Sequence, residues 1–570
     1  MEPVRERRWR LRDADETAVL SLARGAKLPE LLARILVTRG ITESVSAGRF
    51  LNATLGECHD PFLLSGMNEA VARLVAARQS GESVCVYGDY DVDGITATAL
   101  LVEFFRSVGI VCFYHIPNRM EHGYGLAESG IRSAAAGGAR VIVSVDCGVT
   151  AVAEAALCRT LGIDLIITDH HTPGPLLPDA CAVINPVLPD SPFPFKLLAG
   201  VGVAFNLLIA LRSRLRQAGV FAEREAPNLR HFLDLVALGT IADIVPLTDE
   251  NRLFVRFGLK ELSTSRRTGI VALKEVAGIT GDVSCYDVGF RLAPRLNACG
   301  RLEDATRGVE LLLCRNPDEA AVIAGELDAS NSERQQIEKE ILDDALLLLE
   351  AEERELSGIV LASGEWHPGV IGIVASRIVE RYHRPTVLIA LMDGNGRGSG
   401  RSIPAFHLYE ALLACSGTLQ KFGGHKYAAG LSLTETDLPA FVADFEAHAA
   451  GCLTTDDLLP EILVDAELAP EDILLSLPTL VARLEPYGAG NPTPLFLLRG
   501  ATIINWRILK EKHLKLTIAL PSGRVDAIAF NRADFDCSGA VDLLFSPEIN
   551  VWNGRESLQL KIKDLRKSVP

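Results

Sequence analysis

Acidic residues stand at or near the ends of four apolar segments of this sequence. The segments are VCVYGDYDVDG (84–94), VIVSVDCG (141–148), LIITDHH (165–171) and LDLVALGTIADIVPL (233–247), and their polar members of interest are Asp89, Asp91, Asp93, Asp146, Asp169, His170, His171 and Asp243. We interpret the four segments as strand-like runs that end in these acids. In open parallel sheets, ligands bind beyond the carboxyl ends of the strands. We therefore expect these side chains to converge on one crevice.

Carboxylates that converge in a crevice repel one another and lose hydration, so we expect cations among them. Oxygen-rich ligation with one or two imidazoles suits Mn²⁺ or Mg²⁺ better than structural zinc. Asp91 and Asp93 alternate, and alternate residues of an extended segment point to the same side. A carboxylate shared by two ions about 4 Å apart is the arrangement that clamps the attacking and leaving oxygens in phosphoryl hydrolysis.

A purely structural role is the alternative for each of these residues. A single aspartate at a strand end is usually a turn residue or a helix cap, and the tripeptide Asp169–His171 alone is a weak signal. Four acidic ends in one region are much harder to explain in this way. The twelve cysteines are scattered without a C-x-x-C pair, and Cys85, Cys112 and Cys181 lie in apolar runs. This pattern predicts buried reduced thiols rather than a thiolate zinc site.

The elements that must position the acids alternate between strand and helix from about residue 82. We expect strands at 84–89, 109–117, 141–148 and 164–171, with helices over 96–109 and 150–160. These strands are apolar throughout rather than alternating, which is typical of strands that are covered on both faces. The sequence therefore predicts an α/β fold with a doubly wound parallel sheet.

Composition shifts divide the chain into five segments. Residues 1–80 are predicted to be mostly helical, 81–265 form the first α/β domain, 266–355 a linking region that contains a long helix over about 317–355, and 356–453 a second α/β domain. Proline, aspartate and alanine mark a boundary around 454–470. Short alternating strands and turn signals in 460–570 predict a small β barrel or sandwich.

Size and charge limit the classes of protein to consider. The chain has 570 residues, 48% hydrophobic and 23% charged, with a formal net charge of −16. This length predicts about two to four domains. The longest apolar stretches are too short to cross a bilayer, and no apolar segment follows the basic N-terminus, so we expect a cytoplasmic protein with no membrane partner. The charge argues against a uniformly basic nucleic-acid coat but leaves room for a local basic groove.

The motifs also resemble those of a known family. GDYDVDGITATALL (88–101), VDCGVT (145–150), TDHH (168–171) and ALGTIADIVPL (237–247) occur in the order of the four motifs of the DHH phosphoesterases. Later motifs resemble the RecJ family of bacterial single-strand-specific exonucleases within that group. They are RLAPRLNACGRL (291–302), GEWHPGVIGIVASRI (364–378), GSGRSI (398–403), KFGGHKYAAG (421–430) and EPYGAGNPTPLF (485–496). The resemblance implies a DHH parallel-sheet domain joined by a long helix to a DHHA1 α/β domain, followed by a C-terminal OB-fold β barrel.

The resemblance further implies two divalent metal ions, Mn²⁺ or Mg²⁺. Asp146 would bridge the two ions. The remaining ligands would be Asp89 and Asp91 for one ion, and Asp93, His170 and Asp243 for the other.

The resemblance assigns different roles to the other two members of the DHH tripeptide. Asp169 would orient the histidines. His171 would lie beside the scissile phosphate, where it would stabilise charge or move a proton. Some relatives have a histidine where this chain has Tyr87, so the first ion would have fewer protein ligands and more water.

A second set of residues matches positions that this family uses for nucleic acid. Arg119, Ser399 and Arg401 would hold the 5′ phosphate, which agrees with the forked geometry of arginine on phosphate oxygens. For the glycine-rich run that contains Ser399 and Arg401, a mobile turn is the alternative. Three further residues would line the path near the active site: Asn297, Arg301 and His425. Trp506 and Trp552 are either stacking platforms for bases or barrel core.

The implied activity is a metal-dependent 5′→3′ exonuclease that degrades single-stranded DNA to 5′ mononucleotides in recombination and DNA repair. Its partners would be single-stranded DNA and, as expected of the family, a helicase and a single-strand-binding protein, and the chain would be a monomer. One alternative is a DHH phosphodiesterase or phosphatase that acts on short oligoribonucleotides or small nucleotides. Those relatives are generally shorter and lack the OB tail. A second alternative is a binding protein with a dead site, but such proteins lose metal ligands that this chain retains.

Overall fold

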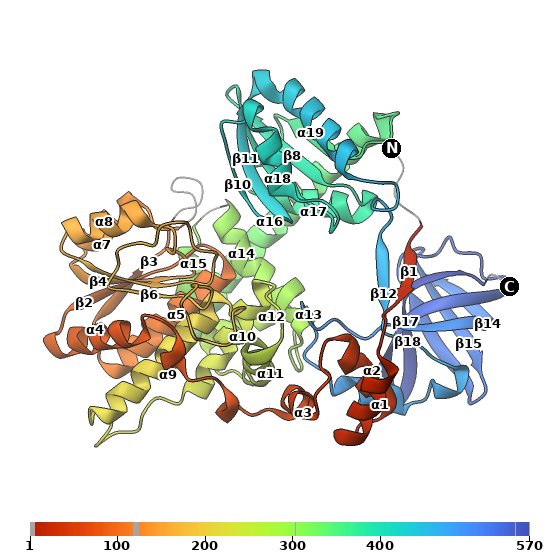
Figure 1. Cartoon of the computed structure of the whole chain (residues 1–570), viewed down its shortest axis with the longest axis horizontal. Helices are drawn as coiled ribbons and strands as arrows, with labels where there is room; N and C mark the ends of the chain where they lie inside the picture. The colour runs from red at the N-terminus through yellow and green to blue at the C-terminus, as the bar shows by residue number, and fades with distance from the viewer. Residues whose placement is uncertain (1–5, 118–124, 303, 553, 569–570) are drawn as a thin grey trace. The chain divides into compact units, whose positions relative to one another are not determined.

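We describe the chain from a computed structural model (Figure 1), which covers residues 6–117, 125–302, 304–552 and 554–568. The side chains of residues 302 and 552 lie outside the description. The described residues form two compact units. One unit contains those of Met1–Arg10, Arg301–Glu303 and Glu326–Ile462, and the other contains those of Leu11–Gly300, Asp304–Gly325 and Leu463–Pro570.

The first α/β domain contains a five-stranded sheet in the order β3-β2-β4-β5-β6. Every pairing in this sheet is parallel, as predicted. The strands are β2 (Ser83–Tyr87), β3 (Cys112–His115), β4 (Ala139–Val145), β5 (Asp164–Thr168) and β6 (Ala182–Ile184).

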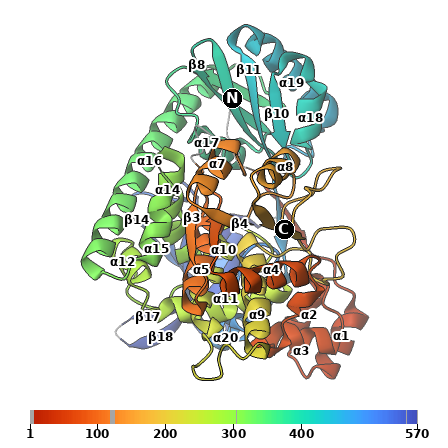
Figure 2. The same ribbon diagram turned by 90° about the vertical axis from the view of Figure 1, so that its left-hand side faces the viewer.

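Helices cover both faces of this sheet, which explains why its strands are apolar throughout. Helices α7 and α8 lie on one face, and α4, α5 and α9 lie on the other (Figures 1 and 2). On the face towards α7 and α8, Cys85, Ile142 and Ile167 belong to one buried cluster with Ile131 and Ala155. The helices are α4 (Met67–Ser80), α5 (Val92–Val108), α7 (Glu128–Ala136), α8 (Val152–Thr160) and α9 (Gly200–Gln217).

The expectation of a fourth strand-like run before Asp243 is wrong. Residues Leu233–Ala242 form helix α10, and Asp243 caps its C-terminal end. Eight of the ten helix residues are buried, so no polar face imposes a helical period on the sequence. A short apolar run of this kind does not distinguish a buried strand from a buried helix.

Asp91 and Asp93 also differ from the prediction, because they do not lie in an extended segment. Asp91 is the N-cap of α5, and Asp93 lies in the first turn of that helix. The side chain of an N-cap aspartate accepts a hydrogen bond from a backbone amide of the first turn, which has no partner within the helix itself. The two side chains are therefore brought together by a helix start rather than by strand alternation.

The remaining elements before the long helix are mostly helical. Before the sheet lie β1 (Arg8–Leu11), α1 (Glu16–Gly25), α2 (Glu30–Thr38) and α3 (Ser44–Asn52). After α10 lie α11 (Asp249–Ser263), α12 (Thr268–Val276), α13 (Cys285–Asp287), a π-helical turn (Val288–Leu292), α14 (Ala293–Leu302), α15 (Thr306–Leu313) and α16 (Pro317–Ala351). Helix α16 has 35 residues and is the long helix predicted for this region.

The second α/β domain has a mixed sheet in the order β10-β11-β9-β8-β7. The glycine-rich run is strand β9 rather than a mobile turn. Glycines on one face of β9 let apolar side chains pack closely, because a Cβ at Gly396, Gly398 or Gly400 would lie within 3.0 Å of one of them. The elements are β7 (Ile359–Ser363), α17 (Ile371–Tyr382), β8 (Thr386–Met392), β9 (Asn395–Arg401), α18 (Leu408–Ala414), β10 (Lys421–Gly424), β11 (Ala428–Thr434) and α19 (Leu438–Cys452).

The C-terminal region forms the predicted β barrel. Its strands pair in the order β14-β15-β16-β18-β17, and β17 pairs again with β14, which closes the barrel. The elements are β12 (Glu461–Val464), β13 (Ala466–Glu467), α20 (Ser476–Ala482), β14 (Phe496–Leu509), β15 (His513–Leu520), β16 (Gly523–Ala529), β17 (Ala540–Trp552) and β18 (Arg555–Lys567). Trp506 on β14 is 53% exposed, so it is not a core residue.

Two composition-based expectations can be compared with the described residues. Cys85 is buried as expected, but Cys112 is half-buried and Cys181 is exposed. Across the described ranges, no helix is both long enough and apolar enough to cross a bilayer.

Candidate metal centre and phosphate-binding residues

The turn between β2 and α5 brings three aspartates to the carboxyl edge of the sheet. Asp91 Oδ1 accepts a hydrogen bond from Gly94 N at 3.0 Å. A Cβ on Gly94 would lie 2.7 Å from the backbone N of Asp89, so only glycine allows the turn to fold this tightly. Asp89 and Asp93 are both 1% exposed, which places their carboxylates inside the protein.

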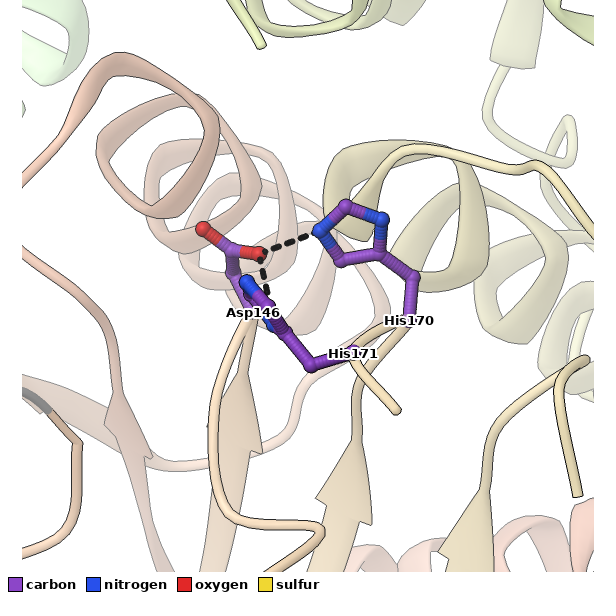
Figure 3. A group of neighbouring side chains, drawn as sticks. All are labelled: Asp146, His170 and His171. Carbon is purple, nitrogen blue, oxygen red and sulfur yellow. Dashed lines mark ion pairs between the residues drawn. The ribbon is translucent and has the colours of Figure 1, made fainter. Parts of the chain in front are cut away.

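The ends of β4 and β5 bring Asp146 next to the DHH tripeptide (Figure 3). Asp146 N donates to Thr168 O at 2.9 Å, which continues the pairing beyond the two strands. Asp146 has a φ of +62°, a left-handed conformation that is uncommon outside glycine. This turn directs its carboxylate towards the histidines, and His170 Nε2 lies 3.1 Å from Asp146 Oδ1.

Among the described residues, three groups of side chains have potential ligand atoms within 4.8 Å of one another. Asp146 belongs to two of the groups and His170 to two, so the three groups form one continuous centre. His170 Nε2 also lies 3.6 Å from Asp243 Oδ2 and 3.9 Å from Asp93 Oδ2. The groups are Asp89, Asp91 and Asp146; Asp93, His170 and Asp243; and Asp146, His170 and His171.

The carboxylates of this centre carry an electrostatic cost that a cation would remove. Burial and the charges of neighbouring aspartates raise the pKa of Asp93 to about 7 and that of Asp243 to about 9. The same causes raise the pKa of Asp146 well above its usual value. Asp243 Oδ2 is also buried without a hydrogen-bond partner among the described residues. Buried oxygen ligands of this kind fit hard divalent cations.

His170 has the protonation state that a metal ligand needs. Burial, followed by the charge of His171, lowers the pKa of His170 to about 4, so its imidazole is neutral at physiological pH. Its Nε2 is buried and has no hydrogen-bond partner in the described part of the chain. Three carboxylates, those of Asp93, Asp146 and Asp243, lie beside this imidazole. A donor set of three carboxylates and one neutral imidazole fits Mn²⁺ or Mg²⁺.

His171 and Asp169 form a separate pair. Asp169 Oδ1 accepts from His171 Nδ1 at 2.8 Å and from the backbone N of His170 at 2.7 Å. Burial would lower the pKa of His171, but the hydrogen bond with Asp169 and the charges of nearby aspartates together outweigh burial, so the pKa is raised. The predicted support by Asp169 therefore reaches the ring of His171, whereas for His170 the contact is with the backbone.

Two backbone amides of helix α9 belong to this centre, and the sequence reasoning missed them. Gly200 N donates to Asp93 Oδ2 at 2.6 Å, and Val201 N donates to Asp93 Oδ1 at 2.9 Å. The start of a helix presents unsatisfied amides and a positive dipole end, so it stabilises the buried carboxylate. A Cβ on Gly200 would lie 2.6 Å from Asp146 Oδ1. The signal in the sequence is the small-residue start of this helix, Ala199–Gly202.

The contacts of Tyr87 are those of a residue with a structural role. Its ring centroid lies 4.9 Å from that of His115, and its hydroxyl accepts a hydrogen bond from Ala127 N at 3.2 Å. Tyr87 is absent from the three groups of potential ligands. The group that contains Asp89, Asp91 and Asp146 consists of carboxylates alone.

Ser399 and Arg401 lie on one face of β9, beside the start of helix α17. Arg401 Nη1 donates to Ser399 Oγ at 3.2 Å and to Gly400 O at 2.8 Å. A Cβ on Gly372, in the first turn of α17, would lie 2.7 Å from Ser399 Oγ and 3.1 Å from Arg401 Nη2. A guanidinium, a hydroxyl and the start of a 12-residue helix are suitable groups for binding a phosphate.

The other predicted nucleic-acid residues lie in different surroundings. Arg119 falls in 118–124, outside the described residues. Asn297 Oδ1 accepts a hydrogen bond from Val92 N at 3.2 Å, so this side chain supports the start of α5. Arg301 Nη1 donates to Gly369 O at 3.2 Å. His425 is exposed, in the turn that leads to β11.

Three family models match this chain in the order of its domains. The DHH family N-terminal domain matches residues 83–240, the DHHA1 domain matches 355–451, and the RecJ OB domain matches 464–564. The three matched ranges correspond, in this order, to the parallel sheet, the mixed sheet and the closed barrel.

Full-length relatives give the same result. The single-stranded-DNA-specific exonuclease RecJ of Salmonella typhimurium is 42% identical over 582 residues, which cover 98% of this chain and 99% of the relative. The crystal structure of RecJ in complex with Mn²⁺ from Thermus thermophilus matches with a TM-score of 0.85 and 35% identity, and the match covers 100% of this chain and 81% of that one. The Mg²⁺ complex from the same organism matches with a TM-score of 0.79 and 33% identity over 99% of this chain and 79% of that one. The chain therefore belongs to the RecJ family of single-stranded-DNA-specific exonucleases.

Proposed function

We propose that this chain is a metal-dependent exonuclease that degrades single-stranded DNA in the 5′→3′ direction and releases 5′ mononucleotides. The observation that carries the proposal is the buried centre in which Asp146 is shared between an all-carboxylate group and a group that includes His170. A shared carboxylate between two cation sites is the arrangement used for phosphodiester hydrolysis. Recombination and DNA repair are the processes that such an activity would serve.

Each residue of the centre has an assigned part in this proposal. Divalent ions, Mn²⁺ or Mg²⁺, would lower the pKa of a bound water and neutralise charge on the phosphoryl oxygens. Asp146 would hold both ions, with Asp89 and Asp91 on one side and Asp93, His170 and Asp243 on the other.

His171 would act on the substrate rather than on the ions. Its Nδ1 is engaged by Asp169, which directs Nε2 away from that acid. The raised pKa of His171 suits a side chain that stabilises negative charge on the phosphate or donates a proton to the leaving 3′ oxygen.

We assign the capture of the strand to other parts of the chain. Ser399 and Arg401 would hold the 5′ phosphate, with Arg119, Asn297, Arg301 and His425 along the path of the strand. Trp506 would stack on a base, because its ring is half-exposed on β14. In this division, 81–265 is catalytic, 1–80 and 266–355 support and link it, 356–453 holds the 5′ end, and 460–570 binds the strand.

A time course on end-labelled substrates tests the proposal. Single-stranded DNA labelled at the 5′ or the 3′ end is incubated with Mn²⁺, with Mg²⁺ or with EDTA, beside a matched duplex. We expect the 5′ label to appear first as a mononucleotide, only with metal, and only from the single strand. Release of the 3′ label first would contradict the polarity. Preferential cleavage of short oligoribonucleotides would instead favour the small-substrate phosphodiesterase.

The partners, assembly and location rest on the family resemblance. We propose that the chain is a monomer in the cytoplasm and that it works with a helicase and a single-strand-binding protein. Light scattering during size-exclusion chromatography measures the oligomeric state directly. Stimulation of digestion on a duplex by an added helicase tests the coupling.

A further inference from the structure

The segment Leu484–Pro492, here called the 484–492 loop, contains the first eight residues of the EPYGAGNPTPLF motif (485–496) and has no part in the chemistry above. It is anchored to helix α11 by Arg252, whose side chain donates to Leu484 O at 2.9 Å and to Glu485 O at 2.7 Å. Asn491 is fully buried and donates to Leu484 O at 2.8 Å and to Pro486 O at 2.7 Å. These bonds close the loop on itself, so it behaves as a rigid piece.

This loop packs directly on the residues that follow Asp243. Leu247 N donates to Ala489 O at 2.7 Å. A Cβ on Gly490 would lie 2.8 Å from Pro246 Cβ and 3.3 Å from its Cα, which are rigid atoms. A Cβ on Gly488 would lie 2.6 Å from Leu247 Cδ1, the end of a flexible side chain. Glycine at these two positions therefore sets how closely the loop approaches Pro246 and Leu247.

The chain between Asp243 and Leu247 has little freedom to absorb a displacement. Asp243 N is bonded to Gly239 O at 2.9 Å in the last turn of α10. Ile244 has a φ of +62°, a left-handed backbone conformation that β-branched residues rarely adopt. Asn251 Nδ2 donates to Pro246 O at 3.1 Å. A shift of Pro246 would therefore pass through this turn to the Asp243 carboxylate.

We propose that Gly490 and Gly488 are positioning residues for Asp243, so that the C-terminal part of the chain sets the geometry of one metal site. The affected ion is the one assigned to Asp93, His170 and Asp243. The ion assigned to Asp89, Asp91 and Asp146 is not affected, because the contacts of the loop described above are with Arg252 and with the residues that follow Asp243. This inference rests on the proposed metal-dependent function.

Gly490→Ala tests the inference, and Gly539→Ala is its matched control. Gly490 and Gly539 have φ values of +69° and +71°, so alanine brings similar backbone strain to both. A Cβ on Gly539 would meet no atom within 4 Å. Mn²⁺ binding to the full chain is measured by calorimetry without DNA. We expect Gly490→Ala to weaken the binding of one of the two Mn²⁺ ions by about 10-fold or more, as for other groups that orient metal ligands. Gly539→Ala should leave both ions unchanged.

Kinetics separate positioning from general destabilisation. For Gly490→Ala, excess Mn²⁺ should restore kcat, while the KM for DNA stays at the wild-type value. Equal Mn²⁺ affinities in Gly490→Ala and the wild type would overturn the inference. Equal weakening by Gly490→Ala and Gly539→Ala would overturn it as well, because backbone strain alone would then explain the effect.

A milder pair of variants decides the question if Gly490→Ala does not fold. In Gly488→Ala the added methyl meets Leu247 Cδ1, and Leu247→Ala in that background removes the clashing atom. We expect the double variant to recover Mn²⁺ affinity relative to Gly488→Ala, and failure to recover would overturn the inference. A wild-type chain that binds Mn²⁺ but lacks exonuclease activity refutes the proposed function alone. A wild-type chain that binds no Mn²⁺ refutes both.

Discussion

The carboxylate centre of the DHH sheet and the Ser399–Arg401 pair of the DHHA1 sheet place charge on an α/β scaffold in opposite ways. In the first, Asp93 and Asp146 are almost fully buried and close to other acids, so burial and repulsion raise their pKa values. In the second, Arg401 is half-buried and donates to the uncharged oxygens of Ser399 and Gly400. Both sites use glycines that let a helix start approach the charged groups.

The two sites differ in what they need in order to keep their side chains charged when no substrate is bound. The carboxylate centre requires a cation before its acids can all be charged, so its ligand is part of its stability. The Ser399–Arg401 pair is hydrogen-bonded already, so the 5′ phosphate that we propose as its ligand would contribute to substrate binding and not to stability. Variants of the first site should therefore change metal affinity, catalysis and stability together. Variants of the second should change the KM for DNA alone.

The largest effect is expected for Asp146→Ala, because both ions lose a ligand. We expect kcat/KM on single-stranded DNA to fall by at least about 10³-fold, since loss of even one stabilising group at a reacting centre costs about 10²–10³-fold. Asp164→Asn, at the far end of the adjacent strand β5, is the control and should retain activity. Full activity of Asp146→Ala with Mn²⁺ would contradict the metal assignment.

His170→Ala and His171→Ala should fail by different routes. His170→Ala is expected to lose Mn²⁺ affinity, because Nε2 is the imidazole atom nearest to three carboxylates. His171→Ala is expected to retain Mn²⁺ and to lose about 10²-fold or more in kcat, the usual contribution of a general acid or base. Calorimetry and steady-state kinetics on both variants measure the two quantities. The same loss of Mn²⁺ affinity in both would show that His171 is also a ligand.

Removal of metal should destabilise the first α/β domain. At a free Mn²⁺ concentration of 100 times Kd, one site contributes about 2.7 kcal/mol to the free energy of unfolding. Thermal unfolding in EDTA and in Mn²⁺ measures the difference in Tm. Asp146→Ala should show little increase in Tm with Mn²⁺, whereas Arg401→Lys should match the wild type. A Tm that does not respond to Mn²⁺ would show that the carboxylates do not require the ion for stability.

The smallest effect is expected for Arg401→Lys on DNA with a 5′ phosphate. Lysine keeps the charge but loses the fork that matches phosphate oxygens, so we expect the KM to rise by about 10-fold, or about 1.4 kcal/mol. DNA with a 5′ hydroxyl should show no such change. Arg397→Lys, on the same strand but exposed, is the matched control. An equal rise of the KM on both substrates would show that Arg401 does not bind the 5′ phosphate.

The pattern of apolar runs predicted the parallel sheet because strands covered on both faces carry that signal without help from distant residues. It predicted Asp146, His170 and His171 at strand ends for the same reason. It was wrong about the run before Asp243, because a helix buried on nearly all sides has no polar period. It was also wrong about how Asp91 and Asp93 approach each other, since a helix cap and a strand can place two acids at the same spacing.

The sequence by itself determined the types of potential metal ligand and their order along the chain. Only the tertiary structure decided which acids lie close enough to share an ion, and that Asp93 is held by amides of α9 that lie 107 and 108 residues further along the chain. It also decided that the 484–492 loop packs on the turn after Asp243. These contacts join backbone groups of segments that are far apart in the sequence. Local periodicity and composition carry no record of such contacts, because they depend on how the elements pack.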